Sequence, residues 1–343
     1  MRFLSLALLA VPALAQDLKQ ALEGTPQGRQ IAADIGNDKR AQDALVPPGK
    51  SQVTLFLPTD RALENHRSNA PRPGQKSKRD LRPEEYVIAE YSSVDGKLLT
   101  GDMAGGKILP SQNKDSTTGK PNDVVTDGQG SARQQPSRLM ARTNVTYPDI
   151  PLPDVSIFGG LGVEARLVVG DIVFDKGVIH LVDTVLDVPK RCSTTIDFLG
   201  YKKFKAALAA AGLLDAIDQP TTTLFAYADD VFTSTADCTA NTLKQNIVPG
   251  FIAYSPKLDD IKTLTTAANT TLKVSFKDGR FFVGDSPIIK SNVICNNGVV
   301  HTLGKLLAPP IVTYQPGSDA ASSRVNQMTI VGAIFLAAWN YLV

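Results

Sequence analysis

The sequence predicts an α+β protein made of two related domains in tandem. A block at 53–63, Val-Thr-Leu-Phe-Leu-Pro-Thr-Asp-Arg-Ala-Leu, recurs in altered form at 222–232 as Thr-Thr-Leu-Phe-Ala-Tyr-Ala-Asp-Asp-Val-Phe. Each copy is followed by a block that contains a Gly-Val pair and a histidine, at 176–186 and at 297–307. Two blocks found twice in the same order indicate a duplicated domain. The length of 343 residues also suggests about two domains.

The first block predicts a buried strand that leads into a helix. Its apolar run is rich in β-branched and aromatic residues, which favour a strand. Pro58 ends the strand because proline cannot donate a ladder hydrogen bond. Thr59 or Asp60 can then cap a helix that begins near Arg61, and Asp229 can do the same in the second copy.

The second block predicts a tight turn followed by a strand. Its glycine permits a positive φ, and the alternation after it places Val178, His180 and Val182 on one face. His301 holds the place of His180 in the second copy. A histidine repeated at one place in a duplicated strand is expected to be structural and hydrogen-bonded across the turn.

Both pairs of blocks resemble those of the fasciclin (FAS1) domain, Thr-Leu-Phe-Ala-Pro-Thr-Asp and Asn-Gly-Val-Ile-His-Val-Ile-Asp-Val-Leu. The chain departs from the family at Tyr227-Ala228, where Pro-Thr is usual, and at 245–250, which lacks a Tyr-His pair. The resemblance covers about residues 16–312. It implies a curved β-wedge flanked by helices in each domain and a role in adhesion, or in binding matrix or cell wall, without catalysis.

The ends of the chain carry targeting patterns. Residues 1–15 combine a basic start, a short apolar run and an Ala-x-Ala site, which predicts a cleaved signal peptide rather than a membrane anchor. The first domain is expected at 16–189 with low-complexity insertions, and the second at 190–312. A linker at 313–327 then precedes a hydrophobic segment at 328–343.

The C-terminal pattern predicts a glycosylphosphatidylinositol (GPI) anchor with Ser318 as the attachment site. Small residues, a polar spacer and a terminal apolar tail are typical of such a signal. The alternative is a retained transmembrane helix, but the tail is short and has no basic flank. The protein is thus expected on the outer face of the plasma membrane, and the plan looks fungal. A retained tail would favour a vacuolar or endomembrane factor.

Two kinds of modification follow from secretion. Asn144 and Asn269 lie in Asn-x-Thr sequons and are expected to carry N-linked glycans. Cys192, Cys238 and Cys295 are the three cysteines, so one disulfide and one leftover thiol are expected, with three possible pairings. A pairing of Cys238 with Cys295 is favoured.

Two polar stretches interrupt the first domain. Residues 66–82 are basic and predict an exposed loop, either simply solvated or in contact with an anionic polymer or phospholipid. Residues 112–137 are rich in small polar side chains and predict an insertion without a core. Asp171-Ile172 matches the place of an Asp-Ile pair linked to integrin binding in animal family members, but nothing else indicates that partner.

Several function classes have no support in the sequence. A net charge of +2 gives no global field for nucleic acid. No nucleophile with a base, phosphate loop or metal-ligand cluster appears, so no catalytic residue, cofactor or metal is predicted. The expected function is adhesion to cell-wall or matrix polymer or to other surface proteins, through many weak contacts. A secreted ligand carrier or enzyme stays open as an alternative.

Overall fold

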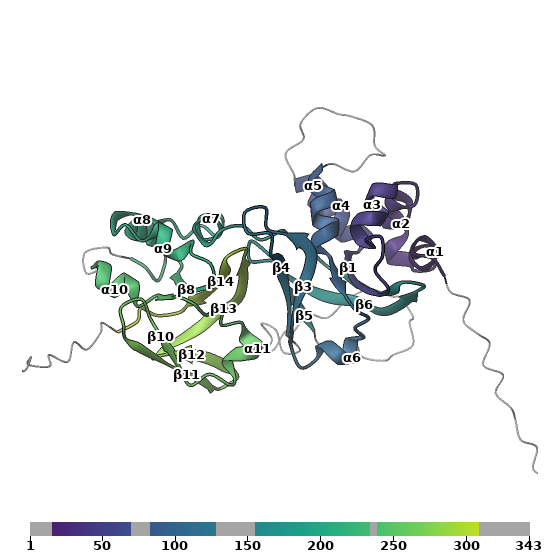
Figure 1. Ribbon diagram of the computed structural model, residues 1–343. Helices are drawn as coiled ribbons and strands as arrows, with labels where there is room; N and C mark the ends of the chain where they lie inside the picture. Colours follow the sequence, from purple (N-terminus) through teal and green to yellow (C-terminus); the bar gives the residue numbers. More distant parts are fainter. Residues whose placement is uncertain (1–15, 70–82, 128–154, 234–238, 309–343) are drawn as a thin grey trace, which may run out of the picture. The chain divides into compact units, whose positions relative to one another are not determined.

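A computed structural model describes residues 16–69, 83–127, 155–233 and 239–308 (Figure 1). These residues contain two β-structures. Strands β1–β7 close into a barrel, the N-terminal module, and β8–β14 form a seven-stranded sheet, the C-terminal module. The predicted α+β class, with two related domains that each combine a sheet with helices, is confirmed. The expected signal peptide, Asn144, Cys238 and Ser318 lie outside the described residues.

The N-terminal module begins with short helices and then winds its barrel. Its elements are α1 (Leu18–Glu23), the 3-10 helix η1 (Pro26–Gly28), α2 (Arg29–Ile35), α3 (Lys39–Leu45), β1 (Val53–Pro58), α4 (Asp60–Asn69), α5 (Pro83–Tyr91), β2 (Ser93–Asp95), α6 (Thr100–Met103), β3 (Lys107–Lys114), β4 (Pro121–Asp127), β5 (Ser156–Phe158), β6 (Glu164–Phe174) and β7 (Gly177–Val182).

The C-terminal module has a similar order of elements, with one described helix, α10, between its first two strands where the N-terminal module has α4 and α5. Its elements are α7 (Cys192–Phe198), α8 (Lys202–Ala210), α9 (Leu214–Ile217), β8 (Thr222–Tyr227), α10 (Ala240–Lys244), β9 (Ile247–Val248), α11 (Ser255–Leu258), β10 (Thr263–Thr265), β11 (Thr271–Lys277), β12 (Arg280–Val283), β13 (Ser286–Cys295) and β14 (Gly298–Leu303).

The two repeated sequence blocks are neighbouring parallel strands. Strand β1 pairs with β7 over six residues, from Val53 opposite Gly177 to Pro58 opposite Val182. Strand β8 pairs with β14 in the same way. Both partners are buried along their whole length because helices and strands cover both faces, as is usual for parallel pairs.

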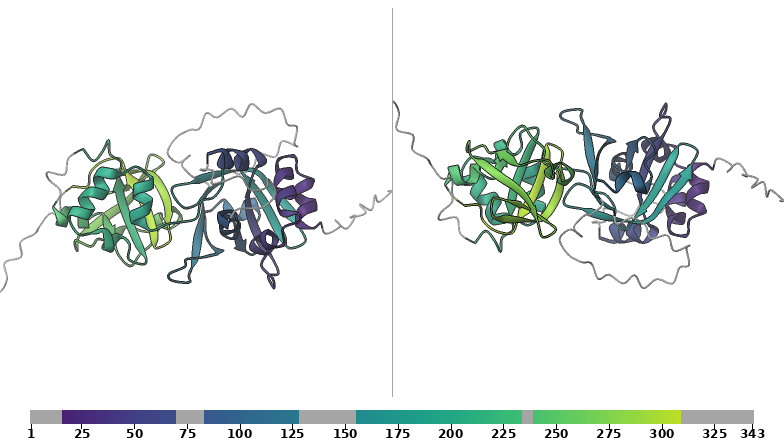
Figure 2. Two further views of the ribbon diagram at one scale, coloured as in Figure 1. Left: turned by 90° about the horizontal axis from the view of Figure 1, so that it is seen from above. Right: turned by 90° about the horizontal axis from the view of Figure 1, so that it is seen from below.

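Alternate residues of β1 serve different cores. In β1, Leu55 and Leu57 pack under α1–α3, whereas Phe56 points into the barrel with Tyr91 and Met103. In the C-terminal module, α7–α9 pack on β8 and β14, and the ribbon shows these helices on one face of the sheet (Figure 2). Each helical layer therefore buries one face of a sheet whose central strands carry the repeated blocks.

The glycines of the second block are needed mainly because the backbone of the parallel partner strand lies too close for a side chain. A Cβ on Gly177 or Gly298 would lie 1.8 Å from the carbonyl oxygen of Val53 or Thr222, on the parallel partner strand. Gly177 has φ 150°, but Gly298 is not among the positive-φ residues. The expected positive φ therefore holds for the first copy and is wrong for the second.

The two motif aspartates do not cap the helix expected after the first block. Thr59 caps α4 through its hydroxyl, which accepts from Ala62 N at 3.2 Å. Asp60 instead accepts from Gln30 N at 3.0 Å, at the start of α2. Asp229 accepts from Lys203 N at 2.9 Å, at the start of α8.

No helix follows β8 directly, since residues 229–231 form a turn. Each aspartate thus satisfies a free N–H group of a helix earlier in the chain, which local sequence cannot reveal.

Two polar stretches are more ordered than their composition suggests. The stretch expected to lack a core is 112–137, of which the structure describes 112–127; its residues 112–114 end β3, and 121–127 form β4 and bury Val124 and Val125. A hydrogen bond between buried polar side chains helps to stabilise the pairing of β3 with β4: Asn122 Nδ2 donates to Asn113 Oδ1 at 2.7 Å. In the basic stretch, Arg67 lies on α4 and pairs with Asp34 and Glu85, so it is not a free surface charge.

Candidate functional site

The two modules share a set of hydrogen bonds in which both repeated blocks contact one loop. In the N-terminal module Thr54 Oγ1 donates to Gly96 O at 2.7 Å and accepts from Leu98 N at 2.9 Å. In the C-terminal module Thr223 makes the same pair of bonds, to Phe251 O and from Ala253 N, at 2.7 and 2.9 Å. The threonine of the first block therefore fixes the loop that precedes α6 or α11 through two hydrogen bonds.

The histidine of the second block holds the same loop. His180 Nε2 lies 2.8 Å from Leu98 O, and His301 Nε2 lies 2.8 Å from Ala253 O. Both imidazoles are fully buried, and they lie beside the phenylalanine rings of the first blocks at centroid distances of 5.7 and 5.9 Å. Burial lowers the pKa of His180, and lowers that of His301 to about 4 despite the bond to Ala253. Each neutral imidazole therefore fixes its loop by a hydrogen bond to a backbone carbonyl, and neither histidine lines the cavity described below.

A third repeated contact fixes the start of α6 and α11. Asp171 accepts from Thr100 N at 2.9 Å, and Asn292 accepts from Ser255 N at 2.8 Å. Both residues have a left-handed backbone, with φ of 59° and 53°, at irregular positions of β6 and β13. Asp171 is thus an exposed helix-capping residue, and this position bonds to the start of a short helix in both modules.

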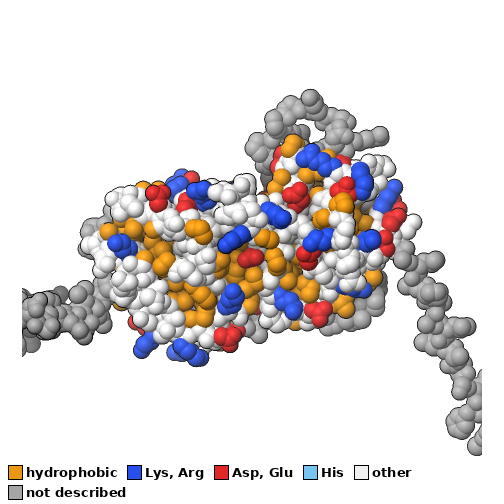
Figure 3. All heavy atoms as spheres, in the orientation of Figure 1, with side chains coloured by type: hydrophobic (Ala, Val, Ile, Leu, Met, Phe, Trp, Pro, Cys, Tyr) orange, Lys and Arg blue, Asp and Glu red, His pale blue; other side chains and the backbone are white. Residues whose placement is uncertain are grey.

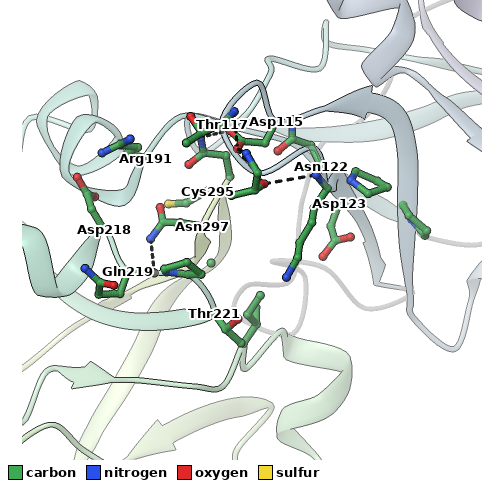
Figure 4. A pocket seen from close by; sticks show the side chains of 18 of the residues that line it. Asp115, Thr117, Asn122, Asp123, Arg191, Asp218, Gln219, Thr221, Cys295 and Asn297 are labelled. Carbon is green, nitrogen blue, oxygen red and sulfur yellow. Dashed lines mark hydrogen bonds between the residues drawn. The ribbon is translucent and has the colours of Figure 1, made fainter.

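The candidate binding site is a cavity of about 500 Å³ (Figure 4). Its walls come from the β3–β4 hairpin, the loop that enters β8 and the turn between β13 and β14. Figure 4 shows Arg191 and Asp218 on one side of it and Asp123 on the other. The lining side chains are mostly hydrogen-bonding groups: Asp115, Thr117, Thr118, Lys120, Asn122, Asp123, Arg191, Asp218, Gln219, Thr221, Asn296 and Asn297.

Asp115 organises one wall of this cavity. Its carboxylate accepts from Thr118 N at 2.7 Å, from Thr117 N at 3.1 Å and from Asn296 Nδ2 at 2.7 Å. Burial by itself would raise the pKa of Asp115, but the hydrogen bonds from Thr118, Asn296 and Thr117 outweigh it and lower the pKa. The wall therefore carries a fixed negative charge at neutral pH.

Asp123 is a second carboxyl group of the lining, and its pKa is shifted in the opposite direction to that of Asp115. Burial raises the pKa of Asp123, although a 3.0 Å hydrogen bond from Tyr254 Oη and the charge of Lys257 act in the opposite direction. Tyr254 is itself buried, and its pKa lies well above the ordinary value because of burial and the neighbouring Asp123. Tyr254 remains a hydroxyl donor, so this wall presents a carboxylate held by a fixed phenol.

Two side chains of the lining contain buried acceptors without a partner. These are Asn122 Oδ1 and Asn296 Oδ1, whose amide nitrogens donate to Asn113 and Asp115. Among the described residues such atoms are few, and a buried acceptor left unpaired costs about 1–3 kcal/mol. Because these two oxygens are sealed from water, the groups of the lining that a ligand can reach are others, such as the exposed side chains of Arg191, Lys120 and Gln219.

Among the described residues, the cavity lining contains carboxyl groups but no histidine. Neither His180 nor His301 lines it, and its one cysteine, Cys295, is buried. In the described ranges no group of three His, Cys, Asp or Glu side chains could hold a metal ion. On the face drawn in Figure 3 positive and negative side chains are interspersed, without a broad area of one sign.

Of the predicted modification sites, the structure places one. Asn269 is exposed in the turn between β10 and β11, with φ 57°, so its side chain is open to solvent. Cys295 is buried near Cys192, and the favoured partner Cys238 lies outside the described residues. Across the part of the chain that the structure covers, no helix has the length and apolar character needed to cross a membrane.

Sequence reasoning missed the cavity altogether. Asp115 and Asn296 meet across 181 positions, and Asn122 sits in a stretch that was expected to lack a core. The Asn296-Asn297 pair before Gly298 gave no local signal of a site, because asparagine and glycine are common in tight turns.

Comparison with known proteins agrees with this geometry. The fasciclin domain model matches residues 199–309. A fasciclin-like arabinogalactan protein of Arthroderma benhamiae is 24% identical over 329 residues, covering 93% of this chain and 72% of that protein. The fasciclin-like arabinogalactan protein CTB11 of Cercospora beticola is 26% identical over 209 residues, covering 55% of this chain and 56% of that protein.

Among solved structures, a FAS1 domain pair from the insect cell adhesion molecule fasciclin I matches with a TM-score of 0.36 and 15% identity, over 81% of this chain and 95% of that one. The range matched by the family model contains the second copy of both repeated blocks, and the alignment with the Arthroderma benhamiae protein covers 93% of this chain. Residues 199–309 therefore form a fasciclin domain, and over most of its length the chain is similar to a fungal fasciclin-like arabinogalactan protein.

Proposed function

We propose that this protein is a non-enzymatic adhesion protein of the cell surface that binds a hydroxyl-rich polymer of the cell wall or matrix. The cavity at Asp115 and Asn296 carries the proposal. It offers carboxylates, amides and a guanidinium to a ligand. The names of the two fungal relatives, fasciclin-like arabinogalactan proteins, support the surface role.

The mode of attachment is part of the same proposal. A GPI anchor near Ser318 would hold many copies on one surface, so that weak contacts by each cavity add up through multivalency. N-linked glycans at Asn144 and Asn269 complete the surface form. The exposure of Asn269 in its turn supports the second of these sites.

Binding is tested with soluble oligosaccharides from cell-wall β-glucan and from chitin, by calorimetry on the secreted full chain. Arg191→Ala and Gln219→Ala remove exposed hydrogen-bonding groups from the lining and should each weaken binding about fivefold, the value of one hydrogen bond. Lys202→Ala, on the exposed start of α8, is the matched control. Equal affinities for all four proteins would place the polymer elsewhere.

Attachment is tested by treating intact cells with phosphatidylinositol-specific phospholipase C and sequencing the new C-terminus by mass spectrometry. Release with a terminus near Ser318 would support the surface-anchored function. Retention of a chain that still ends at Val343 would favour the vacuolar or endomembrane alternative.

A further inference from the structure

The first turn of α7 and the end of β13 are bound together at one point in the C-terminal module. Asn296 N donates to Lys190 O at 3.0 Å, and Cys192 N donates to Asn297 Oδ1 at 3.0 Å. These bonds bring Cys192, the first residue of α7, beside Cys295, the last residue of β13. The two cysteines are 103 positions apart in the sequence, so only the fold makes them neighbours.

The side chains of both cysteines lie in the same hydrophobic core. Cys192 is 0% and Cys295 5% exposed, and both belong to the hydrophobic cluster formed by α7–α9 with β8 and β14. Burial raises the pKa of Cys192 well above its ordinary value, and a hydrogen bond with the Cys295 thiol raises it further. Both cysteines are thiols in the structure.

We propose that Cys192 and Cys295 are joined by a disulfide in the mature protein, and that Cys238 is the leftover thiol. The proposal depends on the extracellular location proposed above, because disulfides persist in oxidising compartments. The bond would close a loop containing all the strands of the C-terminal module except β14. It would also fix the turn that supplies Asn296 and Asn297 to the cavity.

The oxidant is the disulfide of a thiol–disulfide oxidoreductase or of glutathione. One thiolate attacks that disulfide and releases a thiolate, which gives a mixed disulfide. The second thiolate then attacks the mixed disulfide, so that the S–S bond forms. Two protons and two electrons leave the cysteine pair, and the oxidant is reduced to two thiols. Because the buried Cys192 thiol resists deprotonation, oxidation should precede or accompany packing of α7.

The test is peptide mapping of the full chain without reduction. Protein purified from a secreting eukaryotic host should yield a peptide containing Cys192 linked to Cys295, with Cys238 free for alkylation. Cys238→Ser should keep this linkage, whereas Cys192→Ser and Cys295→Ser should abolish it. Reduction of the wild type and of Cys238→Ser should lower the midpoint of thermal unfolding by roughly 10 °C.

A second experiment tests the Cys192–Cys295 linkage independently of the proposed extracellular location. Protein denatured, reduced and refolded in glutathione buffer should form the Cys192–Cys295 linkage whatever its compartment in the cell. A Cys238–Cys295 linkage there, or three alkylated thiols, overturns the pairing. The linkage in refolded protein, combined with three free thiols in protein isolated from cells, supports the pairing and contradicts the extracellular location.

Discussion

Acidification should destabilise the C-terminal module through His301. This imidazole is fully buried, its Nε2 bonds to Ala253 O at 2.8 Å, and its Nδ1 has no partner. Burial disfavours the imidazolium and the bond to Ala253 only partly offsets it, so the pKa falls from the ordinary 6.5 to about 4. The native protein therefore keeps His301 neutral at pH values where an unfolded chain binds a proton.

The sign and size of the effect follow from this difference. Between pH 6.5 and pH 4 the unfolded state binds more protons, so the free energy of unfolding falls as the pH falls. With these two pKa values the loss is about 1 kcal/mol at pH 6 and about 2 kcal/mol at pH 5. It approaches about 3 kcal/mol below pH 4. A lowered pKa of His180 acts in the same direction in the N-terminal module.

Urea unfolding followed by circular dichroism at pH 7.5 and pH 5.0 measures this loss. His301→Gln retains an amide donor for Ala253 O but cannot titrate, so its stability should fall by about 2 kcal/mol less than that of the wild type over this interval. His180→Gln provides the equivalent comparison in the other module. Equal losses for the wild type and His301→Gln would refute the reasoning, because the carboxylates common to both proteins would then account for the whole pH dependence.

Three further outcomes are expected. Gly298→Ala should cost at least about 3 kcal/mol in chemical denaturation, because its Cβ would lie 1.8 Å from the partner strand, whereas Gly105→Ala meets no atom within 4 Å and should change stability by under about 0.5 kcal/mol. Asp229→Ala should cost about 1 kcal/mol by the same assay, since the start of α8 loses its acceptor; an unchanged midpoint would argue against the cap. Thr271→Ala destroys the sequon at Asn269 and should remove one glycan that glycosidase treatment detects on a gel; an unaltered band would mean that the site is unused.

The sequence predicted the elements that carry local patterns and missed those that depend on distant partners. The apolar runs before Pro58 and at the second block are strands because their residues are buried on both faces. The duplication also pointed to His180 and His301 as equivalent. That each histidine holds a loop preceding a short helix became visible only once Leu98 and Ala253 were in place.

Composition misled the prediction where polar residues pair with one another. The stretch containing Asn113 and Asn122 has few large apolar side chains, yet it forms strands, and the side-chain amides of these two residues hydrogen-bond across the hairpin. Asp60 and Asp229 also looked like local caps, whereas their partners lie about 30 positions earlier in the chain. The cavity could not be predicted because its walls are joined by contacts such as that of Asp115 with Asn296.

The parallel pairing of the repeated blocks has a consequence for how the chain folds as it is synthesised. Strand β1 ends at Pro58 and its partner β7 begins at Gly177, so 118 residues must be made between them; for β8 and β14 the interval is 70. At about 5–20 residues per second, β1 waits roughly 6–24 s for its partner and β8 roughly 4–14 s. The apolar edge of β1 is therefore the longer-lived target for chaperones and for mispairing on the ribosome.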